Sequence, residues 1–289
     1  ERLRLEQIAR SGLKPQIFNL QTRQIPYQSG HIIIIRIPRS YHSPHQISFN
    51  NHNRYYIRAN NGKYEPDVNS LRYLFNSTMQ FEHQVRSWRN ERIDKINSKR
   101  TPVILDSNRA ILAIHLIPYS FTDPNTRLDL TKIESNKKHF IPQNDRIIDK
   151  DLTHYYCDQS FYNFDGYLFY TNHKGKNKMQ RAYTQIFRSG AIESVSSISK
   201  EIPHQTDSTK LESVISTDLI QNFITHCSHD YATGLSKLGI TAPVVMSISL
   251  LAIKNCVIRK NYSCNSTSAL IPQEENLIFT EIILPHPHI

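Results

Sequence analysis

Four consecutive isoleucines at residues 32–35 constrain the fold of this chain more than any other stretch. With Arg36 and Ile37 they form an apolar run that is too short and too rich in β-branched side chains for a helix. A run without polar alternation is typical of a strand that is covered on both faces. Pro38 lacks the backbone N–H that a ladder requires, so the strand should end there. The sequence therefore predicts a central strand over residues 32–37.

A second strand is predicted over residues 54–59. Because successive side chains of a strand point to opposite faces, Arg54, Tyr56 and Arg58 share one face. Two guanidinium groups and a phenol ring suit a polyphosphate chain that carries stackable bases. The alternative is a solvated face whose arginines pair with local carboxylates. The three residues alone favour neither interpretation.

The order and spacing of motifs in this region resemble a known family. The stretches concerned are Arg36-Ile-Pro-Arg-Ser40, Pro44-His45, and Tyr55-Tyr-Ile-Arg58 with Asn60. They resemble the C-terminal half of the Schlafen-type AlbA domain, a nucleic-acid-binding domain common in bacterial proteins. The resemblance covers roughly the first hundred residues, and residues 161–170 and 185–193 look like the region that often follows the domain. In Schlafen nucleases the catalytic carboxylates lie in the upstream half, so no catalytic residue is carried over to this chain.

The net charge of +10 is unevenly distributed along the chain. Residues 1–100 hold 17 Lys and Arg and 7 Asp and Glu, and the remaining residues hold 18 of each kind. All the excess positive charge therefore lies in the part that resembles the nucleic-acid-binding domain. Concentrated positive charge attracts polyanions and supplies sequence-independent affinity for phosphates. An anionic membrane would attract it too, but neither an amphipathic lipid-packing segment nor a lipidation signal is present.

A long helix is predicted over residues 67–99, where apolar side chains recur at helical spacing. Its second half carries a ridge of cations with a spacing of about three residues. The cations named as candidates are Arg86, Arg89, Arg92 and Lys95. They could contact phosphates along a groove, or they could form a solvated helix face that Glu82, Glu91 and Asp94 balance. For this helix alone, the solvated face is favoured.

We predict an α/β (α+β) fold of two mixed-sheet units with packed helices. Residues 1–100 would be the C-terminal part of a Schlafen AlbA-like domain, and residues 101–289 a second α/β domain of unknown role. In the first unit, strands over residues 16–25 and 32–37 should pair across a turn at residues 28–30. Strands over residues 46–49 and 54–59 should meet at an Asn-rich turn.

The second unit should begin with an apolar strand over residues 110–118, which ends on a proline as the first one does. The two strand ends, Ile37-Pro-Arg-Ser40 and Ile117-Pro-Tyr-Ser120, are similar over four residues, which is weak evidence of an internal repeat. The other expected elements are a polar connection over 123–158 with a short helix, a hairpin over 164–170 and 182–187, a strand over 190–195, a helix over 210–237, and strands over 243–253, 257–260 and 277–284.

Metal and nucleotide chemistry find little support in the sequence. His226 and His229 could share one helix face with Cys227 nearby, but zinc would need further ligands, and Cys256 and Cys264 have no knuckle spacing. Only 8 glycines occur, and none builds a phosphate-binding loop. No metal site and no cofactor is therefore predicted, and widely spaced cysteines fit a reducing cytosol.

The leading hypothesis is a cytoplasmic bacterial protein whose first unit binds the backbone of DNA or RNA. The candidate contacts are Arg36, Arg39, His45, Arg54, Tyr56 and Arg58, supported by Arg86, Arg89, Arg92 and Lys95. For His45, a structural role is favoured over a nucleic-acid contact. Two alternatives stay open, a Schlafen-like metal-dependent RNA endonuclease with its carboxylates upstream, and a scaffold or sensor subunit that binds a protein partner. No membrane partner is expected, and a homo-oligomer is left open.

Overall fold

The computed structural model describes two compact units, Glu1–Arg86 and Ser87–Ile289, each of which is treated by itself. The described residues are 2–17, 20–37, 40, 42–60, 62–106, 109–122, 127–142, 159–171, 179–204, 209–240, 243–262 and 269–284. Helices and several mixed or antiparallel sheets are present, which confirms the predicted α+β class. Along the chain, the boundary between the units follows Arg86, inside a long helix, whereas the sequence analysis placed it near residue 100.

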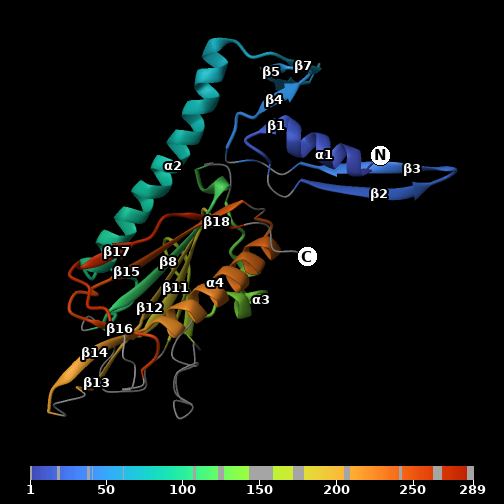
Figure 1. Ribbon diagram of the computed structural model, residues 1–289. Coiled ribbons are helices and arrows are strands. Elements are labelled where there is room, and N and C mark those ends of the chain that lie inside the picture. Colours follow the sequence, from blue (N-terminus) through green and yellow to red (C-terminus); the bar gives the residue numbers. More distant parts are fainter. Residues whose placement is uncertain are drawn as a thin grey trace. The chain divides into compact units, whose positions relative to one another are not determined.

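The first unit consists of small sheets and two helical segments (Figure 1). Its elements are α1 (Arg2–Gly12), β1 (Leu13–Lys14), β2 (Gln21–Tyr27), β3 (Gly30–Arg36), β4 (Gln46–Phe49), β5 (His52–Tyr55), β6 (Ile57–Ala59), β7 (Gly62–Tyr64) and the first part of α2 (Val68–Asn97). The strands form one sheet in the order β1-β4-β5 and two separate hairpins, β2-β3 and β6-β7.

Two predicted hairpin turns are confirmed. β2 and β3 pair antiparallel from Gln21 opposite Arg36 to Tyr27 opposite Gly30, which leaves a two-residue turn. β4 and β5 are joined by Asn50 and Asn51, both of which have positive φ. Asparagine tolerates this left-handed conformation better than most residues, so the Asn-rich sequence suits the turn.

The prediction of a central isoleucine strand is wrong. β3 pairs only with β2 in the described part of the chain, and the pair forms a ribbon. Ile32, Ile34 and Ile35 are each more than two-fifths exposed, and Ile33 is half-buried. The composition of the run predicted the strand correctly, but composition does not show whether other segments cover it. We refer to β2 and β3 together as the ribbon.

The predicted strand over residues 54–59 is interrupted. β5 ends at Tyr55 and β6 begins at Ile57, so Tyr56 lies between two strands that belong to different sheets. Arg54 and Arg58 therefore do not lie on one continuous strand face. The pattern of alternating side chains was real, but it extends over a break between two hairpins.

The first unit buries few apolar side chains. Among its described residues, Phe81 and Val85 are the large apolar side chains that are fully buried, and both belong to α2. By contrast, many large apolar side chains of the unit are exposed, on the ribbon as well as on α1 and α2.

The second unit has a large sheet between two helices. Its elements are the rest of α2, β8 (Ile111–Pro118), α3 (Thr131–Ser135), β9 (Gln159–Tyr162), β10 (Gly166–Tyr170), β11 (Ala182–Phe187), β12 (Ile192–Ser197), β13 (Ser199–Pro203), β14 (Leu211–Ser216), α4 (Thr217–Lys237), β15 (Val244–Leu251), β16 (Val257–Arg259), β17 (Asn276–Ile278) and β18 (Ile282–Leu284), with short 3₁₀ turns at Tyr119–Thr122 and Lys137–His139.

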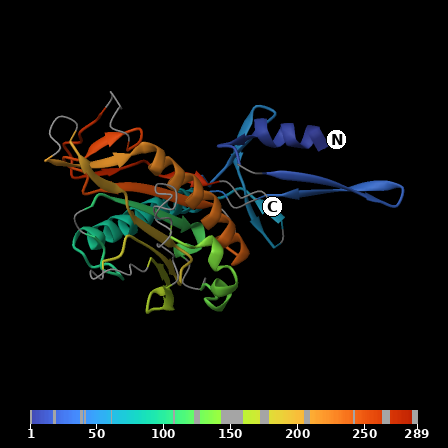
Figure 2. The same ribbon diagram turned by 90° about the horizontal axis from the view of Figure 1, so that it is seen from below.

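The large sheet is antiparallel, in the order β17-β15-β8-β12-β11-β10-β9, and β18 also pairs with β15. Leu112, Ile114 and Leu116 belong to the core cluster that packs on α4. Ile111 and Ala113 belong to a second cluster with Ile93 and Ile96 of α2. Because successive residues of β8 point to opposite faces, the two helices cover opposite faces of the sheet. Figure 2 shows this layered arrangement.

Most elements of the second unit were predicted correctly, with one clear error. The strands over 110–118, 182–187 and 243–253 correspond to β8, β11 and β15. The helix predicted over 210–237 instead begins at Thr217, after strand β14. Ser216 accepts a hydrogen bond from the backbone N–H of Leu219 and caps the helix, while Val214 and Ile215 are buried in the sheet β13-β14-β16.

Other predictions for this unit have mixed outcomes. The last strand is divided into β17 and β18, which both pair with β15. The similarity at Ile37 and Ile117 does not reflect a repeat, since Ile37 is exposed after a ribbon and Ile117 lies in the middle of a sheet. The lysine-rich loop at 172–178 and much of the 123–158 connection lie outside the described residues.

Candidate nucleic-acid interface

The ribbon presents two arginines on one face. Arg36 is opposite Gln21 in the ribbon, and Arg23 is opposite Ile34, two positions along. Residues that differ by two positions on a strand point to the same side, so Arg23 and Arg36 are diagonal neighbours on one face. Both are exposed, and Arg23 has no acidic partner among the described residues. Arg39, the next predicted contact, lies outside the described residues.

The β6-β7 hairpin carries a second pair of cations. Arg58 lies directly opposite Lys63 in the antiparallel register, and both side chains are exposed. The Lys63 ammonium nitrogen lies 4.8 Å from the centroid of the Tyr56 ring. In the described part of the chain neither cation has a carboxylate partner. Like charges directly opposite each other destabilise a strand pair, and an anion bound between them would remove this repulsion.

Arg54 is close to the same hairpin but is already neutralised. Its guanidinium donates a hydrogen bond to the Glu65 carboxylate, and both side chains are about half exposed. This hydrogen bond and charge raise the pKa of Arg54 above its usual value. An exposed pair of this kind is weak, so a phosphate could compete with Glu65.

His45 makes a contact within the first unit, of the kind that the favoured structural role requires. Its Nδ1 lies 2.6 Å from the carbonyl oxygen of Pro15, so the ring is held against the chain segment that follows β1. The side chain is only half-buried, yet its Nε2 atom is buried and has no hydrogen-bond partner among the described residues. The histidine therefore joins two segments of the first unit.

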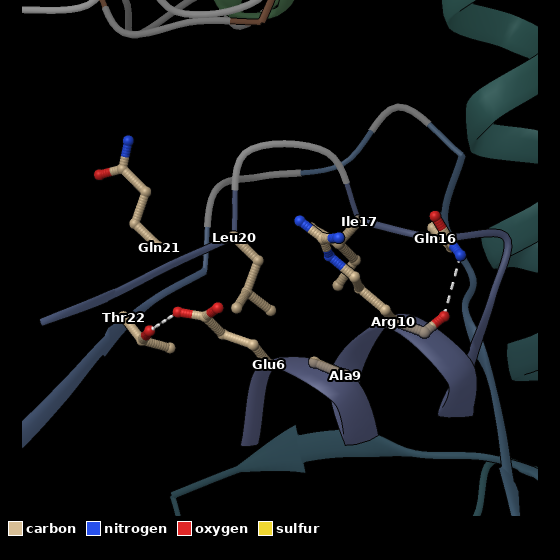
Figure 3. Close-up of a pocket in the computed structure, with 8 residues that line it drawn as sticks. All are labelled: Glu6, Ala9, Arg10, Gln16, Ile17, Leu20, Gln21 and Thr22. Atoms are coloured by element: carbon tan, nitrogen blue, oxygen red, sulfur yellow. Dashed lines mark hydrogen bonds between the residues drawn. The ribbon is translucent and has the colours of Figure 1, made fainter. Parts of the chain in front are cut away.

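A polar pocket of about 420 Å³ lies between α1 and the start of the ribbon. Figure 3 shows the residues that line it, among them Glu6 and Arg10 of α1 and Thr22 of β2. Thr22 donates a hydrogen bond to the Glu6 carboxylate, and the Gln16 side-chain amide donates one to the Arg10 carbonyl oxygen at 3.0 Å. Arg10 is exposed and has no acidic partner in the described part of the chain, which gives the pocket a cationic side.

The cations on α2 differ from the predicted ridge. Arg89 and Arg92 are 8% and 5% exposed, so the structure contradicts a phosphate-contacting role for both. For Arg89 and Arg92 it also contradicts the solvated helix face, because these two guanidinium groups pair with Glu281 and Glu193. For Arg86 and Lys95 the favoured balance by Glu82 and Glu91 is confirmed. The other two cations pair along the helix, Lys95 with Glu91 at 2.7 Å and Arg86 with Glu82 at 3.8 Å.

Glu193 is the centre of a fully buried polar network in the second unit. Its carboxylate accepts hydrogen bonds from Arg92 at 2.7 and 2.8 Å and from the Tyr183 hydroxyl at 2.8 Å, and His115 Nε2 lies 3.1 Å away. Burial raises the pKa of the carboxyl group, but Arg92 and His115 outweigh it and lower the pKa to about 2. The network lies between α2 and the large sheet, and none of its four side chains lines the pockets described at Glu6–Thr22 or near Ile96 and Ile111. Because all four side chains are buried and bonded to one another, we assign the network to structure.

No metal centre is present among the described residues, where no group of three His, Cys, Asp or Glu side chains is suitably placed. Cys227 is a buried residue of α4, and burial raises the pKa of its thiol to about 12. His226 and His229 lie on the same helix without further ligands in that part of the chain. Cys264 lies outside the described residues. None of the described helices is long and apolar enough to span a membrane.

Three cations of the candidate interface were missed in the sequence analysis, namely Arg10, Arg23 and Lys63. The predicted pairing of residues 16–25 with the isoleucine run could have identified Arg23, because it implies a partner for Ile34. Lys63 had no comparable signal, since β7 was not expected.

Comparison of the chain with protein-family models, with curated proteins and with solved structures finds no match. The resemblance to the Schlafen-type AlbA domain therefore stays an expectation from the sequence motifs.

Proposed function

We propose that the first unit binds the sugar–phosphate backbone of DNA or RNA. The observation that carries the proposal is the pair of opposed cations Arg58 and Lys63, with the Tyr56 ring below Lys63. Two cations with no carboxylate between them favour a bound phosphate. The aromatic ring beside them offers a face on which a base could stack.

The distribution of charge supports the same proposal. Residues 1–86 contain 12 Lys and Arg and 5 Asp and Glu. The cations of α2 beyond Arg86 mostly pair with acids of the second unit, so they contribute little to an external surface. The exposed excess therefore belongs to the first unit, where the ribbon adds Arg23 and Arg36 and the pocket adds Arg10. Such a surface would give affinity without sequence preference.

The test is a titration of the full chain against a fluorescein-labelled single-stranded DNA, and an RNA of the same sequence, at several salt concentrations. The double variant Arg58→Gln/Lys63→Gln should weaken binding. It should also make the dependence of log K on log salt shallower by about 1.4, because each phosphate contact to a single strand contributes about 0.7.

A matched control changes two exposed cations of the second unit, Arg127→Gln/Lys254→Gln, which removes the same charge from the chain. This control should leave the salt slope unchanged. If the parent chain does not bind at low salt, or if both double variants change the slope equally, a phosphate site on the β6-β7 hairpin is excluded.

A further inference from the structure

We propose that a second copy of this chain adds to the open edge of β3, so that two ribbons join into one four-stranded antiparallel sheet about a two-fold axis. Strand addition at an exposed sheet edge is a common mode of association. The proposal concerns a protein contact and does not depend on phosphate binding. It rests on the edges, the register and the charges of the ribbon.

The two edges of the ribbon differ in what they allow. The outward-facing backbone groups of β2 belong to alternate residues that include Pro26, and a proline on an edge strand blocks pairing with another strand. β3 contains no proline, and its one charged residue, Arg36, is at its end, so that only His31 and the four isoleucines lie between Gly30 and Arg36. β3 has no neighbour other than β2 among the described residues. A long and apolar open edge is a template for another chain.

The hairpin fixes which backbone groups of β3 are available. The pair that closes a two-residue turn, here Tyr27 and Gly30, exchanges hydrogen bonds within the ribbon. Alternate residues from there on direct their N–H and C=O groups away from β2. The available groups are therefore those of His31, Ile33 and Ile35. An antiparallel copy centred on Ile33 brings all three into register, with His31 opposite Ile35 and Ile33 opposite itself.

The same register gives favourable side-chain pairs. Each Ile32 lies opposite an Ile34 of the second copy, and these side chains are 46% and 48% exposed in the single chain. Arg36, the one charged residue of β3, falls opposite Gly30 of the second copy. The two Arg36 side chains are thus at opposite ends of the joined strands. The two Arg36 side chains are therefore not paired with each other, and isoleucine is paired with isoleucine on both faces of the sheet.

The occupant is a second copy because β3 is complementary to itself. A two-stranded ribbon is marginally stable in water, and a sheet of three or more strands with an apolar face is much more stable. Edge pairing over a single strand buries less surface than a permanent dimer interface does. The dimer should therefore be weak and should form as the protein concentration rises.

The test is sedimentation equilibrium of the full chain over a wide range of concentration. The parent chain should change from monomer to dimer. Ile33→Lys and Ile33→Glu should each remain monomeric, because like charges would lie opposite each other on the two-fold axis. An equimolar mixture of the two variants should dimerise again, because Lys then faces Glu. Ile25→Lys, on the protected strand β2, is the matched control and should dimerise as the parent chain does.

Amide hydrogen exchange of the parent chain gives a readout that needs no variant. Protection of the Ile33 and Ile35 amides should rise with protein concentration, and protection of β2 amides that face outward should not. A parent chain that stays monomeric throughout overturns the proposal. So does a dimer that Ile25→Lys disrupts as strongly as Ile33→Lys does, because that result would indicate association through a ribbon face.

Discussion

The buried carboxylate of Glu193 links the stability of the second unit to pH. Its pKa is about 2 in the folded chain, against an ordinary value of 4.5. A group whose pKa is lowered by folding stabilises the fold above its unfolded value and loses that contribution as the pH falls toward its folded value. We therefore expect roughly 3 kcal/mol of unfolding free energy to disappear between pH 4.5 and pH 2.

Urea unfolding at pH values across this window measures the effect, and Glu193→Gln supplies the comparison. The variant should be less stable than the parent at neutral pH, because Arg92 is then buried without a countercharge. Its stability should also depend less on pH in the acid range. An exposed carboxylate changed in the same way, Glu134→Gln, should keep the parent's acid dependence. Equal slopes for the Glu193 variant and the parent would contradict the assignment.

Individual residues show why the candidate site was only partly predictable. The spacing of Arg89 and Arg92 placed them correctly on one helix, but their partners Glu281 and Glu193 are distant in sequence. Nothing local in the sequence shows that a cation is neutralised by such a residue. Arg58 was identified correctly as an exposed cation. Its position opposite Lys63 follows from the pairing of β6 with β7, which no sequence motif predicts.

At the scale of elements, α4 packs so closely on a neighbouring segment that it requires a glycine. A Cβ atom built on Gly234 would lie 2.4 Å from the Phe140 ring, which is fully buried between Phe169 and Tyr231. Gly234→Ala should therefore destabilise the protein by about 1–3 kcal/mol through overpacking. This loss outweighs the helix propensity that alanine gains, which is about 1 kcal/mol.

Thermal unfolding of three variants separates the two effects. Gln221→Ala, at an exposed position of the same helix, should be neutral or slightly stabilising. Gly234→Ala should lower the melting temperature, and adding Phe140→Leu should make the double variant more stable than the sum of the two single losses predicts. Strict additivity would mean that the helix does not need this close approach.

Two similar apolar runs show what the sequence can and cannot predict about elements. Residues 110–118 were correctly predicted as an apolar strand, and this strand is buried because β12 and β15 lie on either side and helices cover both faces. Residues 32–37 have the same signature, but in the described part of the chain only β2 lies beside them. An apolar run indicates a strand, and its burial depends on segments elsewhere in the chain. The start of α4 was predicted wrongly for a related reason, since Val214 and Ile215 of the preceding strand fit the pattern of a helix as well as that of a strand.

At the scale of the whole chain, the two units should differ widely in local stability. All eight residues of β8 are buried, and so are all eight of β15 beside it. Neither edge of the ribbon pairs with another described strand and most of its side chains are exposed, and its unit buries only Phe81 and Val85 among the large apolar side chains that the structure describes. Opening the ribbon therefore costs little, whereas opening β8 requires most of the second unit to unfold. Hydrogen exchange at high dilution should show ribbon amides exchanging orders of magnitude faster than those of β8. If the ribbon and β8 were equally protected in a monomeric sample, the first unit would have a stabilising contact other than the self-pairing of β3.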